Sequence, residues 1–358
     1  MKIAIDCRHI DASGGIGVYT RECLPYFLGS ANDFLLLGDK DKLAFVKGHK
    51  NAEIIHCGIK PFSLRDTFVF SGKVLKKINQ CDLYYSPYFN IPCCVAVPVF
   101  ITIHDIIFPD MPDLVSLPGL WARMFFYRRA ARLASVIFTV SEFSKSRIEY
   151  NLGKKTPVIN ASNAVNTSYT ANLQKGIAKK KHIIFIGNIK KHKGLNILLD
   201  AYLSARADGL DYDLVIVGGK DNFRSKDREI SSRLTAMEKH GVIFTGHIQD
   251  SEKWLLLAES ALLVQPSLYE GFAYPPLEAM LAGTPVLISD IPVFREVYGE
   301  FPVTFFKKGD SADLKAKLME LLCNKDPKAL VLPARLREKY NFGKVVTKIL
   351  NSFIMGNR

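Results

Sequence analysis

Two carboxylates, Glu270 and Glu278, stand eight residues apart in the segment EGFAYPPLEAM. An apolar run that predicts a strand precedes this segment, and a glycine that predicts a helix end follows it. In one straight helix the two carboxylates would lie about 12 Å apart. Pro275 instead favours a helix that starts there, because proline is well placed in a first helical turn. Glu270 then lies in a tight loop and Glu278 one turn inside the helix. The free N–H groups of such a helix start suit a polyhydroxylated or anionic ligand held at two points.

A second group of reactive residues is basic and also precedes a predicted helix. The run NIKKHKG, residues 188–194, follows a predicted strand at 182–187 and leads into a predicted helix at 195–205. Cations at a helix N-terminus oppose the helix dipole unless an anion bridges them and the N–H groups. The run therefore predicts an anion-binding loop. Spacing alone leaves solvated surface residues open as the alternative, both for this loop and for the two glutamates.

A polar pair, His104 and Asp105, ends the apolar run at residues 100–103. The carboxyl ends of parallel strands are where α/β sheets bind ligands, so His104 is placed to donate to a hydroxyl or phosphate group of a ligand. A histidine packed against its loop, with Asp105 as a cap, is the alternative. The two residues are adjacent and no second histidine follows at a ligand spacing, so we expect no metal site.

A glycine-rich loop follows the first predicted strand, at residues 2–7. Gly15 and Gly17 begin a dinucleotide fingerprint, but Thr20 stands where its third glycine belongs. The loop therefore suits a close approach to a ligand more than a complete NAD site. An NAD-dependent oxidoreductase of the Rossmann type stays open as an alternative function.

Strands and helices alternate along most of the chain, which predicts an α/β fold with parallel sheets. The polar, aperiodic segment 160–181 has linker composition. We therefore expect two Rossmann-like domains, at 1–165 and 166–340, followed by a C-terminal helix at 341–358. Further strands are expected at 34–37, 53–56, 83–86, 136–140, 212–217 and 242–244, and further helices at 19–28, 68–78, 120–132, 252–259, 311–323 and 343–353.

Composition and charge limit the class of protein. The chain has 358 residues, 48% of them hydrophobic, and a formal net charge of +13. The basic excess occurs in both halves, which argues against a disordered nucleic-acid-binding arm. Seven cysteines without a C-x2-C pair indicate buried thiols in a reducing compartment. The chain starts with a strand pattern and contains no apolar run long enough to span a membrane, so we expect a cytoplasmic protein.

Several of these motifs together resemble glycosyltransferase family 4. Glu270 and Glu278 match the two ends of the E-x7-E signature of retaining glycosyltransferases, within EGFAYPPLEAMLAGTPVLISD. The segment GNIKKHKGL is similar to the G-x-L-x-x-R-K-N-L diphosphate loop, with Lys193 on its lysine. GGIGVY and VSEFSK are also typical of the family. The chain departs from the pattern at four positions: His192 replaces a usual Arg, Asn188 an occasional Arg, Ala273 a Gly and Tyr274 an aliphatic residue.

The resemblance implies a GT-B fold, in which two Rossmann-like domains face a central cleft and the terminal helix returns to the first domain. It also implies a retaining glycosyltransferase without metal or other cofactor, whose substrate is a nucleotide diphosphate sugar. Catalytic roles would fall to Glu270, Lys193 and His104. Donor contacts would fall to Gly15, Gly17, Gly187, Asn188, Lys190, His192, Gly218, Phe272, Ala273, Tyr274 and Glu278.

Within that family the context of His104 favours GDP-mannose as the donor, with UDP- and dTDP-sugars as alternatives. A lipid-linked or surface polysaccharide would be the acceptor, and no nucleic-acid partner is expected. The basic amphipathic helix predicted at 120–132 could lie on an anionic membrane surface. Packing of its aromatic face on the sheet is the alternative. The first interpretation would place the protein peripherally on the inner face of the cell membrane.

Overall fold

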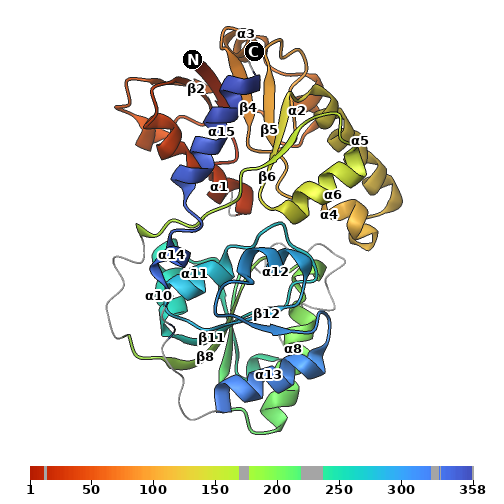
Figure 1. The fold of residues 1–358 in the computed structure, drawn as a ribbon, viewed down its shortest axis with the longest axis vertical. Helices are drawn as coiled ribbons and strands as arrows, with labels where there is room; N and C mark the ends of the chain where they lie inside the picture. Colours follow the sequence, from red (N-terminus) through yellow and green to blue (C-terminus); the bar gives the residue numbers. More distant parts are fainter. Residues whose placement is uncertain (12–13, 169–176, 219–236, 324–329, 331, 357–358) are drawn as a thin grey trace. The chain divides into compact units, whose positions relative to one another are not determined.

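The chain divides into two compact units in a computed structural model (Figure 1). The structure describes residues 1–11, 14–168, 177–218, 237–323, 330 and 332–356. Unit 1 comprises Met1–Ala164 and Tyr340–Arg358, and unit 2 comprises Val165–Lys339. Residues 169–176 of the predicted linker lie outside the described residues.

Unit 1 is built on a seven-stranded sheet in the order β3-β2-β1-β4-β5-β6-β7, and every pairing in it is parallel. Its strands are β1 (Lys2–Asp6), β2 (Asp33–Gly38), β3 (Ala52–His56), β4 (Leu83–Ser86), β5 (Val99–Thr102), β6 (Val136–Thr139) and β7 (Val158–Asn160). The central strands are buried along their whole length, as expected for a parallel sheet covered by helices on both faces.

The helices of unit 1 divide between the two faces of this sheet. They are α1 (Gly15–Leu28), α2 (Leu64–Phe68), α3 (Gly72–Ile78), α4 (Ile107–Asp110), α5 (Leu117–Leu133), α6 (Glu142–Leu152) and α15 (Phe342–Gly356), with short 3-10 turns at Ala44–Val46 and Pro112–Leu114. One core joins α3 and α5 to the sheet through Ile78, Met124 and Tyr127.

The C-terminal helix α15 packs beside α1 on the sheet of unit 1 (Figure 1). Its Phe353 is fully buried, and its ring centroid lies 4.7 Å from that of Phe100 and 5.6 Å from that of Tyr85. Apolar burial of this kind fixes a helix to a sheet without any directional contact. The last residues of the chain therefore complete the core of its first half.

Unit 2 has a six-stranded parallel sheet in the order β10-β9-β8-β11-β12-β13. Its strands are β8 (Lys180–Ile186), β9 (Asp213–Val217), β10 (Val242–Gly246), β11 (Ser260–Gln265), β12 (Val286–Ser289) and β13 (Thr304–Phe306). Its helices are α8 (Leu195–Ala207), α10 (Asp250–Glu259), α11 (Pro275–Leu281), α12 (Pro292–Tyr298), α13 (Ser311–Cys323) and α14 (Ala334–Arg337), with 3-10 turns η3 (Lys191–Lys193) and η6 (Glu238–His240).

The predicted α/β fold with two Rossmann-like sheets is confirmed, and so is the helix start at Pro275. Two predictions were wrong. The helix expected at 68–78 is two helices, because the chain breaks between Val69 and Ser71 and the Ser63 hydroxyl caps an earlier start. The helix expected from Tyr19 begins at Gly15, so Gly15 and Gly17 form its first turn and not a loop.

Two further expectations concerned the burial of the cysteines and membrane-spanning helices. Cys7, Cys23, Cys57 and Cys81 are buried as expected, whereas Cys94 and Cys323 are exposed, and all are free thiols. Among the described residues, no helix has the length and apolar character needed to cross a membrane.

Candidate donor-binding site

The candidate site in unit 2 lies where β8, β9 and β11 end at the same edge of the sheet. Gly187 follows β8 and donates its N–H to the Val217 carbonyl at 3.0 Å. Gly218 follows β9, and a Cβ placed on it would lie 2.4 Å from the carbonyl oxygen of Gly187. Gly218 therefore allows the two turns to pack backbone against backbone, whereas a Cβ added at Gly187 would make only ordinary contacts with the Phe185 ring.

The basic turn η3 is locked onto the loop after β11. Gly194 closes this turn at φ +69°, and a Cβ placed there would lie 1.9 Å from the Pro266 carbonyl oxygen. The Leu268 N–H donates to the His192 carbonyl at 2.7 Å. The motif position after Lys193 thus requires glycine for two reasons, a left-handed backbone and a close backbone approach.

Lys193 and Glu270 form the central ion pair of the site. The Lys193 ammonium lies 2.7 Å from Oε1 and 2.8 Å from Oε2 of Glu270, so both carboxylate oxygens accept from it. The side chain of Glu270 is 8% exposed and that of Lys193 is 21% exposed. The carboxylate is thus nearly removed from water while the ammonium keeps one side accessible. The structure brings together two residues that lie 77 positions apart in the chain.

A chain of hydroxyl and amide groups holds Glu270 from behind. The Ser267 hydroxyl donates to Glu270 Oε1 at 2.7 Å, and the Gln265 amide donates to that hydroxyl at 3.0 Å. The Ser289 hydroxyl, at the end of β12, donates to the Ser267 carbonyl. The serine that orients the carboxylate is therefore itself held by the last residues of β11 and β12, which are more rigid than the loop.

The second carboxylate of the motif, Glu278, has a lysine partner of its own. Lys253 in α10 lies 2.8 Å from Glu278 Oε1 and 3.1 Å from Asp250 Oδ1. Burial disfavours the charged form of Lys253, but Glu278 and Asp250 outweigh it, and the pKa of the ammonium is raised. The sequence analysis missed Lys253, because nothing in the linear spacing of α10 and α11 connects it to the motif.

The loop between the two glutamates carries a strained residue. Ala273 adopts φ +68°, a conformation that costs a non-glycine residue about 1–2 kcal/mol. It stands where the family pattern has glycine, so this chain keeps the left-handed turn with an alanine. The Tyr298 hydroxyl donates to the Ala273 carbonyl and helps to hold the turn. Phe272 is buried, with its ring centroid 6.1 Å from that of Tyr274.

His192 cannot replace the charge of an arginine in this loop at neutral pH. Burial, followed by the neighbouring Lys193 ammonium, lowers the pKa of His192 to about 4. The imidazole is therefore neutral above about pH 5 and offers hydrogen bonding without charge. Lys190, before the turn, is exposed, and Asn188 is half-buried. The positive charge next to the buried Glu270 carboxylate thus comes from Lys193 and not from His192.

The remaining predicted residues belong to unit 1. His104 follows β5, and its Nε2 lies 2.9 Å from the Pro87 carbonyl oxygen, so this nitrogen carries the proton. Burial lowers the pKa of His104 to about 4. Since the only proton of the neutral ring is donated to Pro87, His104 would accept a hydrogen bond from a hydroxyl at Nδ1 and not donate one as expected. The Tyr19 ring, two residues after Gly17, packs edge-on against it at 4.9 Å.

A buried charge cluster at the end of β1 was also missed by the sequence analysis. Arg8 pairs with Asp6 at 2.5 Å and with Asp66 at 2.7 Å, and all three side chains are almost fully buried. The Tyr84 and Tyr88 hydroxyls donate to Asp6 at 2.8 and 2.6 Å. Burial raises the pKa of Asp6, but Arg8 and these hydroxyls outweigh it and lower the value. The cluster fixes α2 and the loop after β3 to the end of β1.

Comparison with known proteins shows which family the domain with this site resembles. Residues 171–339 match the family described as "Glycosyl transferases group 1". The matched residues make up most of unit 2, so the expected resemblance of this part of the chain to the group 1 glycosyl transferases is confirmed. The match favours a transferase over the oxidoreductase considered above.

Two relatives are the O-antigen chain mannosyltransferase RfbU of Salmonella typhimurium and the O-antigen chain mannosyltransferase B of Escherichia coli. The first is 30% identical over 228 residues, which are 63% of this chain and 61% of the relative. The second is 26% identical over 234 residues, 61% of this chain and 59% of the relative. The chain thus matches about three fifths of the length of either.

Among solved structures, Anabaena Alr3699/HepE in complex with UDP and glucose has a TM-score of 0.71 to this chain at 18% identity. The likeness covers 99% of this chain and 100% of the other. A sucrose-phosphate synthase from Thermosynechococcus elongatus has a TM-score of 0.72 at 16% identity, over 99% and 98% of the two chains. These likenesses confirm the fold over the whole chain.

We predict that Gly194→Ala destabilises unit 2 by about 3 kcal/mol or more. The left-handed backbone costs about 1–2 kcal/mol, and overpacking against Pro266 adds about 1–3 kcal/mol. Gly209→Ala is the matched control, because Gly209 has φ +95° but no atom within 4 Å of its added Cβ. Urea unfolding in a Trp121→Phe background leaves Trp254 as the fluorescent reporter of unit 2. Equal losses in the two variants would contradict the close approach.

We also predict that His192 adds no charge to donor binding between pH 6 and pH 8. Its pKa of about 4 lies below the ordinary 6.5, so the ring loses its proton well below this range. Calorimetric affinities for the nucleoside diphosphates GDP and UDP should therefore change in parallel for the wild type and His192→Gln. If the wild type gained affinity over the variant as the pH fell through 6.5, His192 would act as a cation and this account of the loop would be wrong.

Proposed function

We propose that the protein transfers mannose from GDP-mannose to a hydroxyl group of a lipid-linked or surface polysaccharide, with retention of configuration at the anomeric carbon. The observation that carries this proposal is the Lys193 ammonium, clamped by both oxygens of Glu270 at the carboxyl end of the sheet in a group 1 glycosyl transferase domain. Two relatives of this chain are named as O-antigen chain mannosyltransferases, which supports mannose and a glycan acceptor.

A UDP-sugar donor is the second candidate. It is favoured by the structural likeness to Alr3699/HepE, whose structure contains UDP and glucose. Both candidates require the same contacts to a diphosphate and a ribose, and they differ in the base and the sugar. A dTDP-sugar fits the same contacts.

In this proposal the Lys193 ammonium stabilises the negative charge that develops on the leaving diphosphate. A preorganised cation in a site shielded from water stabilises such charge without reorganisation during the reaction. Glu270 orients the ammonium and accepts hydrogen bonds from hydroxyls of the donor sugar, and Glu278 accepts from the ribose. The leaving phosphate takes the proton of the acceptor hydroxyl on the face it departs from. Charge from Lys193 makes a metal ion unnecessary for this step.

Unit 1 carries candidate substrate contacts of its own. His104 offers Nδ1 as an acceptor to a sugar hydroxyl, and the first turn of α1, with Gly15 and Gly17, offers a close backbone approach. A lipid-linked acceptor would place the protein in the cytoplasm, on the inner face of the membrane. The net charge of +13 favours such a place, because the cytoplasmic leaflet is negatively charged.

We predict that Lys193→Ala lowers the turnover of GDP-mannose by about 10²–10³-fold, the usual cost of removing one preorganised charge-stabilising group. The assay measures GDP release with an extract of lipid-linked glycans as the acceptor. Lys181→Ala is the matched control, since Lys181 also pairs with an acid, Asp211 at 2.6 Å, but at the opposite end of β8.

The control variant should turn over like the wild type, and both variants should give the wild-type circular dichroism spectrum. Near-normal turnover in a folded Lys193→Ala protein would remove the charge-stabilising role from Lys193. Turnover of UDP-glucose and not of GDP-mannose by the wild type would replace the first donor candidate with the second.

A further inference from the structure

Helix α5 carries a row of large apolar side chains that are mostly exposed. Leu117, Trp121 and Phe125 follow one another at intervals of four residues, so they lie along one face of the helix. Trp121 is 72% exposed and Phe125 is 55% exposed. Isolated surface apolar residues are ordinary, but a row of this size marks a surface that is covered by a partner.

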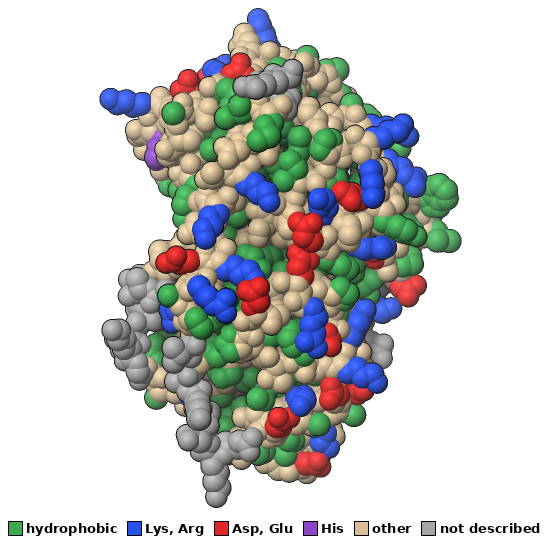
Figure 2. Space-filling model, in the orientation of Figure 1, with side chains coloured by type: hydrophobic (Ala, Val, Ile, Leu, Met, Phe, Trp, Pro, Cys, Tyr) green, Lys and Arg blue, Asp and Glu red, His purple; other side chains and the backbone are tan. Residues whose placement is uncertain are grey.

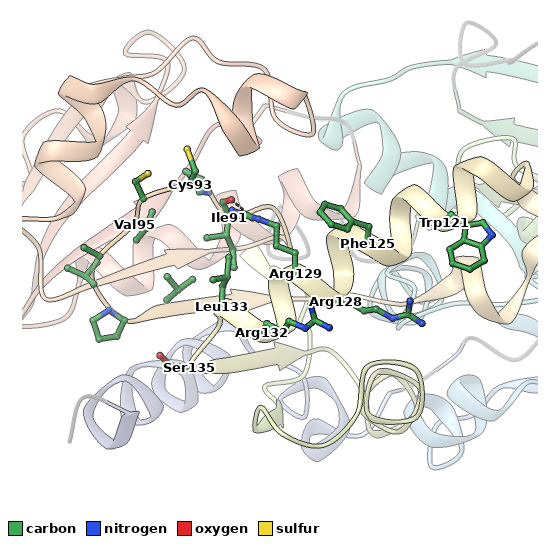
Figure 3. Close-up of a pocket in the computed structure, with 16 residues that line it drawn as sticks. Ile91, Cys93, Val95, Trp121, Phe125, Arg128, Arg129, Arg132, Leu133 and Ser135 are labelled. Carbon is green, nitrogen blue, oxygen red and sulfur yellow. Dashed lines mark hydrogen bonds between the residues drawn. The ribbon is translucent and has the colours of Figure 1, made fainter.

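A groove of about 940 Å³ runs between α5 and the segment 91–99 before and at the start of β5. Figure 3 shows Trp121 and Phe125 projecting from α5, with Arg128 and Arg132 extending from the same helix. Arg129 turns back and donates to the Ile91 carbonyl at 2.7 Å. The groove therefore combines apolar walls with guanidinium groups.

Two of these arginines have no counterion in the part of the chain that the structure describes. Arg128 and Arg132 are one helical turn apart, exposed, and make no hydrogen bond or ion pair with a described residue. The sequence has no acidic residue between Asp113 and Glu142, and the groove lining contains none. The positive charge of this surface is thus uncompensated and suits an anionic partner.

The apolar surface extends from α5 to α2. The ring centroid of Phe68, at the end of α2, lies 6.4 Å from that of Phe126 in α5. Phe68 is 50% exposed, and Leu64 and Val69 beside it are exposed as well. In Figure 2 hydrophobic side chains project at the edge of unit 1 where Figure 1 draws α4 and α5, with Lys and Arg side chains beside them.

We propose that this surface, formed by α5, the groove and the end of α2, docks on a bilayer that contains anionic phospholipid. Arg128 and Arg132 pair with lipid phosphates, and the aromatic row enters the boundary between headgroups and acyl chains. Aromatic residues on one side and arginines on the other are the pattern by which amphipathic helices bind the membrane interface. Both parts of the surface are needed, because a soluble anion would not cover the apolar row.

A second copy of the chain fits this surface less well. A two-fold symmetric interface brings the same patch of both copies together. The arginines would then be buried against a surface that contains no acid, which costs free energy. The bilayer supplies both the missing anions and the apolar phase. This inference deepens the proposed function. It rests on that proposal in one respect, because a lipid-linked acceptor explains why the protein docks on a membrane.

Vesicle flotation tests the proposal with the whole protein. The wild type should float with vesicles of phosphatidylcholine and phosphatidylglycerol, and much less with phosphatidylcholine alone. Arg128→Gln/Arg132→Gln should weaken binding by about tenfold or more, because each basic residue near an anionic surface contributes to affinity. Trp121→Ala/Phe125→Ala should weaken it too, and the effect of the arginines should shrink at high salt.

The matched controls are Lys154→Gln/Lys155→Gln, for two exposed cations of unit 1, and Tyr150→Ala, for an aromatic side chain that is also highly exposed. Both should bind vesicles like the wild type. Equal binding to neutral vesicles, or unchanged binding in the groove variants, would overturn the proposal. So would dimerisation of the wild type, by analytical ultracentrifugation, that Trp121→Ala/Phe125→Ala abolishes.

The two proposals fail separately. Stabilisation of the groove variants by a nucleoside diphosphate should match that of the wild type, because the ligand is held by unit 2 residues far along the chain. Loss of vesicle binding with intact nucleotide binding therefore concerns the docking surface alone. Vesicle binding by a protein that turns over no nucleotide sugar would leave the docking surface standing and overturn the proposed transfer.

Discussion

The ion pair between Lys193 and Glu270 is the interaction on which the candidate site depends. It joins the turn after β8 to the loop after β11, and Gly194 makes it possible by letting that turn touch the Pro266 carbonyl. The pair also changes the electrostatics of the site. A buried carboxylate would repel an anionic donor, and a lone lysine on a loop would sample many positions. Paired, the carboxylate is neutralised and the ammonium is fixed with one side accessible.

Much of this arrangement could be predicted from local signals in the sequence. Pro275 predicted the start of α11, and the position of Glu278 one turn inside that helix followed from this prediction. The regular alternation of apolar runs and helical patterns predicted both parallel sheets. What could not be predicted depends on contacts between distant segments. Lys253 reaches Glu278 from another helix, and Arg8 joins two buried carboxylates 60 positions apart in the chain, Asp6 and Asp66.

The protonation states of the histidines could not be predicted from the sequence either, because they depend on burial in the folded protein. A basic loop with His192 suggests a row of cations, yet desolvation keeps this ring neutral. His104 was expected to donate to a ligand, but its N–H already donates to the Pro87 carbonyl. In unit 1, the sequence left two interpretations of the helix at 120–132 open: Met124 and Tyr127 pack in the core, whereas Trp121 and Phe125 stay exposed. The core and the proposed membrane surface thus share one helix.

Thermal unfolding of the purified protein with GDP, UDP, dTDP and NAD, each without added metal, tests the central claim most directly. A ligand at about 100 times its dissociation constant adds about 2.7 kcal/mol of stability to the state that binds it. The account predicts that GDP raises the unfolding temperature and that Lys193→Ala abolishes this shift. Stabilisation by NAD alone, or by no nucleoside diphosphate at all, would contradict it.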